Sequence, residues 1–154
     1  MIAGAKFSPC RRYRYVLWRE WDGLLPTVVF CGLNPSTADE MKDDPTIRRE
    51  LGYARAWGFG RLLKVNAYGW RDTDPKKMLA VEDPTGPENL ATVVRCAQRA
   101  ALFVAAWGNN IRARMLQKLS APGGIADPEV RHYLSTASGR KLESLDGAFR
   151  LGAA

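Results

Sequence analysis

Three asparagines in this chain each follow an apolar segment of the kind that forms a buried strand. They are Asn34 after residues 28–31, Asn66 after residues 62–65 and Asn109 after residues 101–107. An asparagine amide offers a hydrogen-bond donor and an acceptor together, which suits the edge of a nucleobase. Asparagine after a strand is also a frequent turn residue, and this alternative stays open for each position. Three asparagines in the same position favour a binding site.

A cluster of charged residues follows the first of these strand ends. Asp39 and Asp43 carry carboxylate oxygens, which hard divalent cations prefer, although both also fit solvated loop charges. We keep Asp39 as a candidate catalytic residue and predict no metal. Arg48 and Arg49 fall in the first turn of a predicted helix, whose dipole attracts phosphate. Ion pairing along the helix or plain exposure explains these two arginines equally well.

Other catalytic signatures give little support. His132 is the only histidine, and a lone histidine is more often structural or exposed than catalytic. Ser36 and Thr37 have no histidine nearby in the sequence, and no Gly-x-Ser-x-Gly elbow occurs. Neither a phosphate-binding glycine loop nor a dinucleotide fingerprint is present. The three cysteines have no metal-ligand spacing, so the sequence predicts no cofactor.

The elements that position these residues alternate between strands and helices. Residues 13–18 and 27–33 read as two strands, with hairpin pairing as one possibility. Asp44-Pro45 and Asp74-Pro75 each combine an N-cap with a proline at the first helical position. The remaining predicted elements are strands at 62–65 and 101–107 and helices at 88–100 and 109–119. Alternation of this kind favours parallel pairing.

We therefore predict an α/β fold in three layers, with a central, mostly parallel sheet and an N-terminal strand pair. The 154 residues suit one domain, with a well-marked core over about 12–119 and a weakly marked tail at 120–154. The net charge of +7 suits an anionic partner such as a nucleotide or nucleic acid. No signal peptide or membrane-spanning run is visible, so we expect a cytoplasmic protein without a membrane partner.

Several motifs, in order, resemble the signature of a bacterial domain-of-unknown-function family, number 1643. The resemblance covers about residues 12–119, and the family itself supplies no reaction. The matching motifs are Arg12-Tyr13-Arg14-Tyr15, Leu33-Asn34-Pro35-Ser36-Thr37-Ala38-Asp39, Asp43-Asp44-Pro45-Thr46-Ile47-Arg48-Arg49, Arg71-Asp72-Thr73-Asp74-Pro75 and Ala106-Trp107-Gly108.

The order of motifs also resembles the uracil-DNA glycosylase superfamily, an α/β fold with a central parallel sheet. The resemblance implies that Asn34 places the attacking water, Asn66 reads the base and His132 stabilises the departing base. In that superfamily a proline follows the histidine, whereas this chain has Tyr133. The ligand-binding residues expected at such a site are Gly32, Pro35, Ser36, Asn66, Arg48, Arg49, Arg71, Trp107 and Asn109.

Two functions follow as expectations. The first is hydrolysis of an N-glycosidic bond of a nucleobase, in DNA or in a free nucleoside or nucleotide. The alternative is a module of the same fold that binds a nucleotide or nucleic acid without catalysis. A metal-dependent phosphate-ester enzyme that uses Asp39 and Asp43 is a third, weaker possibility.

Overall fold

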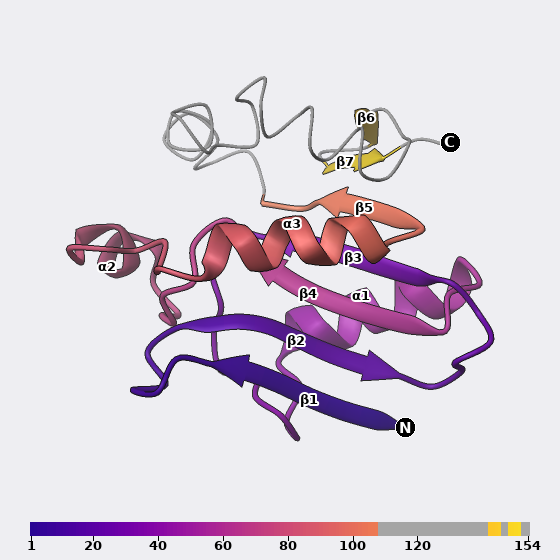
Figure 1. The fold of residues 1–154 in the computed structure, drawn as a ribbon, viewed down its shortest axis with the longest axis horizontal. Helices are drawn as coiled ribbons and strands as arrows, with labels where there is room; N and C mark the ends of the chain where they lie inside the picture. The colour runs from indigo at the N-terminus through magenta and orange to yellow at the C-terminus, as the bar shows by residue number, and fades with distance from the viewer. Residues whose placement is uncertain (108–141, 146–147, 152–154) are drawn as a thin grey trace.

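The computed structural model describes residues 1–107, 142–145 and 148–151. In this part of the chain, seven strands form one sheet in the order β1-β2-β4-β3-β5-β7-β6 (Figure 1). The strands are β1 (Ile2–Phe7), β2 (Arg14–Glu20), β3 (Thr27–Gly32), β4 (Arg61–Asn66), β5 (Leu102–Ala105), β6 (Leu142–Leu145) and β7 (Ala148–Leu151). The helices are α1 (Pro45–Ala56), α2 (Pro75–Ala80) and α3 (Asn89–Arg99).

The sheet is mixed, so the expectation of a mostly parallel sheet is wrong, although the α/β class itself is confirmed. Only the central strands β4, β3 and β5 run parallel. Their connections contain α1, α2 and α3, and a parallel connection needs such a crossover. Antiparallel pairs flank this centre, because β1 and β2 extend it on one side and β7 and β6 on the other.

Residues 13–18 and 27–33 do not pair as a hairpin, which is one possibility that the sequence leaves open. Strand β4 lies between β2 and β3 and pairs with both of them. The N-terminal strand pair consists instead of β2 and β1, and β1 begins before the predicted core at residue 12. The turn that contains Asp22 and Gly23 therefore reverses the chain without making its two flanking strands neighbours.

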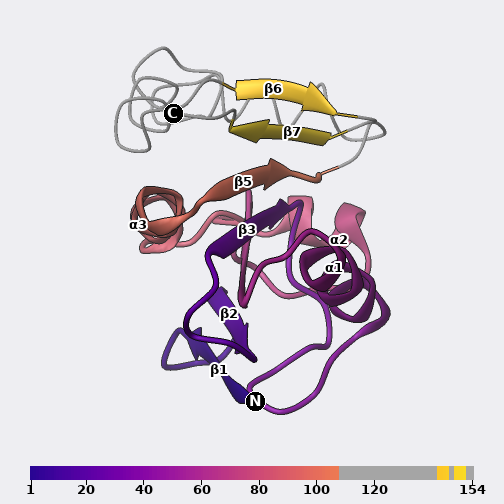
Figure 2. The same ribbon diagram turned by 90° about the vertical axis from the view of Figure 1, so that its right-hand side faces the viewer.

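Alternating residues of the central strands face two separate cores. Val28 and Phe30 of β3 pack with Ile47 and Leu51 of α1, whereas Val29 packs on the other side of the sheet with residues of α3. Figure 2 shows α1 and α3 on opposite sides of the sheet. Full burial of each such aliphatic or aromatic side chain contributes about 1.5–3 kcal/mol, so both faces stabilise the central strands.

The helices begin where the sequence predicts. The Asp44 side chain accepts a hydrogen bond from the Ile47 amide, and Pro45 occupies the first turn of α1. Asp74 caps α2 in the same way, through the Lys76 amide. Among the described residues, no helix is long and apolar enough to cross a membrane. The helix predicted at 109–119 lies outside the described residues.

Candidate functional site

A cavity of about 210 Å³ opens where β3 and β4 end and α1 begins. Strand β3 and the turn after it contribute Gly32, Leu33, Asn34 and Ser36 to its wall, and β4 contributes Lys64 and Asn66. The remaining lining residues are Arg14 from β2, Asp44, Thr46 and Ile47 around the start of α1, and Ala106 and Trp107 after β5. The cavity therefore forms at the carboxyl edge of the parallel strands, where open α/β sheets bind ligands.

Asn66 is the polar residue most clearly available to a ligand. Its exposed fraction is 1%, yet neither its amide nitrogen nor its amide oxygen has a hydrogen-bond partner in the described part of the chain. The backbone carbonyl of Asn66 accepts a hydrogen bond of 2.8 Å from the side-chain nitrogen of Asn89. Burying an amide without hydrogen bonds costs free energy, so a ligand with a complementary edge would offset that cost.

Gly32 allows the side chains of β4 to approach the end of β3. A Cβ atom at Gly32 would lie 2.7 Å from the Lys64 ammonium and 2.8 Å from the Asn66 amide oxygen. Both distances are too short for carbon, so any larger residue would displace one of the two side chains. Glycine at this strand end thus serves close packing of the cavity wall.

Lys64 and Glu50 form a buried ion pair beside Asn66. The Lys64 nitrogen lies 2.5 Å from the Glu50 Oε1, whereas Oε2 has no partner among residues 1–107. Burial raises the pKa of Glu50, and the charge of Lys64 opposes that effect. The pair brings a proton donor and a carboxylate to the carboxyl end of the sheet, in surroundings from which water is largely excluded.

Arg14 reaches the same cavity because β2 contains a bulge. Lys6 faces Val16 and Phe7 faces Arg14, so Tyr15 is an extra residue on β2. In a regular strand, residues three positions apart point to opposite faces of the sheet. The extra residue reverses this alternation, so Arg14 and Leu17 both point to the face that α1 covers. Burial lowers the pKa of Arg14 to about 10, against the effect of Asp44.

The guanidinium of Arg14 is only partly satisfied. Its Nη1 donates to the Ala38 carbonyl over 2.8 Å. Its buried Nε has no hydrogen-bond partner in the described structure. Arg14, a residue of the cavity wall, therefore keeps at least one buried donor without a partner among the described residues.

Hydrogen bonds fix the orientation of Asn34 in the cavity wall. Its amide nitrogen donates to the carbonyls of Asp72 and Pro35 over 2.7 and 3.3 Å. These bonds tie the turn after β3 to the segment that follows β4, as does the bond from the Asp72 amide to the Pro35 carbonyl. With its nitrogen engaged, the side chain of Asn34 can offer a ligand only its amide oxygen, as an acceptor.

The structure brings together five of the residues expected at the site from the sequence. Gly32, Asn34, Ser36, Asn66 and Trp107 line the cavity. Other expected residues, Pro35, Asp39, Arg48, Arg49 and Arg71, are not in its wall. His132 and Asn109 lie outside the described residues.

The two candidate metal ligands have other partners. Oδ1 of Asp39 accepts hydrogen bonds from the amides of Met41 and Lys42, which lower its pKa. Asp43 pairs with the buried Arg19 over 2.9 Å. In the described residues no group of three histidine, cysteine, aspartate or glutamate side chains is placed to hold a metal ion.

Three charged residues of the site, Arg14, Lys64 and Glu50, were not singled out from the sequence. Lys64 interrupts the apolar run of β4, and Glu50 falls in the buried stripe of α1 beside Ile47 and Leu51. A charge at a core position is unusual unless it is paired, and this signal could have identified both residues. The position of Arg14 depends on the bulge, and no comparable signal in residues 14–20 predicts it.

The chain belongs to the family described as proteins of unknown function DUF1643, whose model matches residues 14–137. The matched segment begins at Arg14 and includes every residue in the wall of the cavity. No curated protein and no solved structure matches the chain.

Proposed function

We propose that this protein binds a nucleobase in the cavity at the ends of β3 and β4. The observation that carries the proposal is the amide of Asn66, which is buried in the cavity wall with both polar atoms unpartnered among the described residues. A base edge presents a donor and an acceptor side by side and can satisfy both atoms at once.

The size and lining of the cavity support the same ligand class. About 210 Å³ is smaller than the roughly 300–1,000 Å³ of pockets that bind drug-sized molecules, and a ligand built on one or two small rings fits better. Trp107 and Leu33 supply apolar wall area, and aromatic side chains stack readily on bases.

Hydrolysis of an N-glycosidic bond is the second candidate, and the position of Asn34 favours it. Asn34 and Asn66 line one cavity, as the resemblance to the uracil-DNA glycosylase superfamily implies. The amide nitrogen of Asn34 is held by the Asp72 carbonyl. Its oxygen can therefore accept a hydrogen bond from an attacking water. In this mechanism His132 would stabilise the leaving base.

Binding is tested by calorimetric titration of the full chain with adenosine, guanosine, cytidine, uridine and thymidine. We expect at least one nucleoside to bind, and Asn66→Ala to weaken it by about tenfold or more because one or two hydrogen bonds are lost. Asn66→Asp removes the donor and should change which base is preferred. Equal binding by wild type and Asn66→Ala, or no binding of any nucleoside, would refute the proposal.

Catalysis is tested separately, by base release from nucleosides and from oligonucleotides with uracil, hypoxanthine or a thymine mismatch. Asn34→Ala should retain base binding through Asn66 and lose turnover. If wild type releases no more base than the Asn34→Ala control, the hydrolytic candidate is wrong and the binding function stands alone.

A further inference from the structure

A second and more open hollow, of about 510 Å³, adjoins the proposed base cavity. Ser36 belongs to the walls of both. The second hollow also takes in Arg12 and Arg71, which come from the segments before β2 and after β4. The Arg71 amide donates to the Arg12 carbonyl over 2.8 Å, which fixes the two segments side by side.

Arg12 and Arg71 leave two positive charges in this hollow without a carboxylate partner. Neither forms an ion pair within the described part of the chain. Arg12 is exposed, with its guanidinium carbon 5.4 Å from the centre of the Trp70 ring. Arg71 is half-buried, its Nη1 donates to the Arg11 carbonyl over 3.2 Å, and its buried Nε has no partner in residues 1–107.

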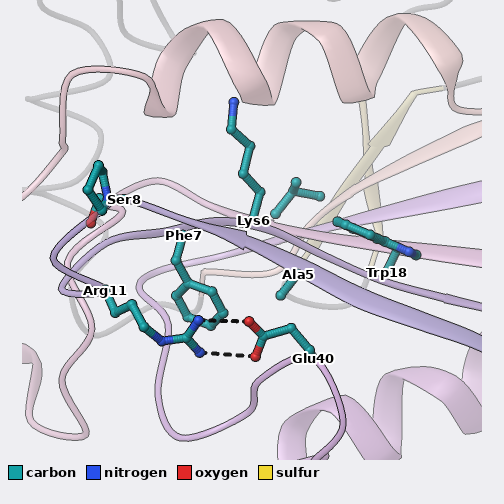
Figure 3. Close-up of a pocket in the computed structure, with 9 residues that line it drawn as sticks. Ala5, Lys6, Phe7, Ser8, Arg11, Trp18 and Glu40 are labelled. Carbon is teal, nitrogen blue, oxygen red and sulfur yellow. Dashed lines mark hydrogen bonds and ion pairs between the residues drawn. The ribbon is translucent and has the colours of Figure 1, made fainter.

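Arg11 also borders the hollow, but its charge is already neutralised. Figure 3 shows its guanidinium facing the Glu40 carboxylate, with two hydrogen bonds of 2.8 and 3.0 Å. The Phe7 ring contacts the guanidinium groups of both Arg11 and Arg71, whose central carbons are 3.9 and 4.7 Å from the ring centre. Glu40 thus engages the charge of Arg11, whereas Arg71 forms no ion pair within the described part of the chain.

The other groups around the hollow suit an anion with several oxygens. Ser36, Thr37 and Thr73 supply hydroxyls, and guanidinium groups match the geometry of phosphate oxygens. The one carboxylate in the wall, Asp72, accepts a hydrogen bond from the Asp74 amide at the start of α2. The lining is therefore cationic overall, with hydroxyl groups beside the two arginines that form no ion pair in the described part of the chain.

We propose that Arg12 and Arg71 bind the phosphate of a nucleotide whose base occupies the cavity next to Ser36. This inference rests on the proposed function and makes it more specific, because the ligand becomes a phosphorylated nucleoside. Under this proposal Arg12 and Arg71 bind the phosphate, in place of Arg48 and Arg49, which the sequence suggested for that role. Arg48 donates to the Asp43 carbonyl over 2.8 Å, and neither of the two residues borders either hollow.

The test compares each nucleoside with its 5′-monophosphate by calorimetry at two salt concentrations. In the wild type we expect the phosphate to increase affinity by about tenfold to a hundredfold, with an advantage that falls as salt rises. Arg12→Gln/Arg71→Gln should remove this advantage and leave nucleoside affinity unchanged. The matched control is Arg48→Gln/Arg49→Gln, which removes the same charge from α1 and should keep the advantage.

Inorganic pyrophosphate serves as a probe without a base, so the two proposals can fail separately. Pyrophosphate binding that disappears only in the Arg12/Arg71 variant supports the phosphate site even if no nucleoside binds. An unchanged advantage of the monophosphate in that variant overturns the phosphate site and leaves the base cavity intact. A short oligonucleotide without terminal phosphates carries only internal phosphodiesters, whereas a nucleoside 5′-monophosphate carries a free monoester. The Arg12→Gln/Arg71→Gln variant should lose affinity only for the ligand whose kind of phosphate the hollow binds.

Discussion

Lys64 of β4 and Glu50 of α1 form an ion pair 2.5 Å long, with 5% and 8% of their side chains exposed. The pair joins the helix to the strand directly beside the cavity. Because each charge is removed from water, either one becomes costly when the other is deleted. The cavity therefore depends on both residues, although only Lys64 is in its wall.

Single substitutions in this pair should destabilise the protein strongly. We expect Glu50→Leu or Lys64→Met alone to lower the free energy of unfolding by about 3–5 kcal/mol, because an unpaired charge stays buried. The double variant Glu50→Leu/Lys64→Met should recover most of that loss. Urea denaturation of the four proteins measures the coupling.

The exposed pair Lys6–Glu88, 3.3 Å long and about half-exposed on each side, is the control for this cycle. Its coupling should fall within about 1 kcal/mol of zero. A double Glu50/Lys64 variant as unstable as either single variant would contradict the interpretation.

Truncation of Asn66 should affect mainly base binding, whereas truncation of Asn89 should affect mainly the free energy of unfolding. Asn66→Ala removes an amide that bonds no described residue, so stability should change by less than about 1 kcal/mol while base binding weakens by about tenfold or more. Asn89→Ala removes donors to the carbonyls of Asn66 and Ala67 and should cost about 1–3 kcal/mol. Thermal unfolding of the two variants checks this, and a larger loss for Asn66→Ala would show that its amide is structural.

Gly32 and Gly52 offer a matched pair of glycine substitutions. Gly32→Ala places a methyl group against Lys64 and Asn66 and should destabilise the protein by about 1–3 kcal/mol. Gly52→Ala, in α1, meets no described atom within 4 Å and should stabilise the helix by about 0.5–1 kcal/mol. Denaturant midpoints measure both effects, and a neutral Gly32→Ala variant would mean that the cavity wall moves easily.

The three cysteines should react very differently with iodoacetamide. Cys10 is exposed, and its contact with the Ser8 hydroxyl at 3.3 Å is the main cause of a pKa below its ordinary value of 9.0. Its alkylation rate should therefore rise with pH and reach half its maximum below pH 9, because the thiolate is the reactive form. Ser8→Ala should move that midpoint upward.

The other two thiols are the internal control for this measurement. Burial raises the pKa of Cys31 to about 12 and of Cys96 to about 11, so both should react only after unfolding. Mass spectrometry of the native protein should show one modified cysteine. Two or three modified thiols before denaturation would contradict the burial of β3 and α3.

Local signals were sufficient to predict the elements that build the site. Asp44-Pro45 marks the start of α1 because capping and proline preference act within one turn. The shared cavity of Asn34 and Asn66 follows from parallel pairing of β3 with β4, which their apolar runs indicated. The functional roles of these asparagines stay predictions.

Long-range pairing explains what could not be predicted. The sequence of residues 14–20 contains no local pattern that predicts pairing of β2 with β4 rather than with β3. The bulge at Tyr15 is equally invisible in sequence, and it decides that Arg14 faces the cavity. The residues of β1 are mostly half-exposed or exposed, so its sequence shows little alternation of apolar and polar residues. For that reason the sequence does not predict this strand.

The strand order also has a consequence for synthesis on the ribosome. Strand β3 pairs only with β4 and β5 among the described strands, and both follow it in the chain. When Gly32 leaves the exit tunnel, the β1–β2 hairpin is the one pairing of the described sheet that can already be in place. The cavity cannot close until Trp107 has been translated, and pairing over such separations is slow to form. The nascent chain must therefore keep the apolar residues 28–31 from aggregating until Trp107 has been added.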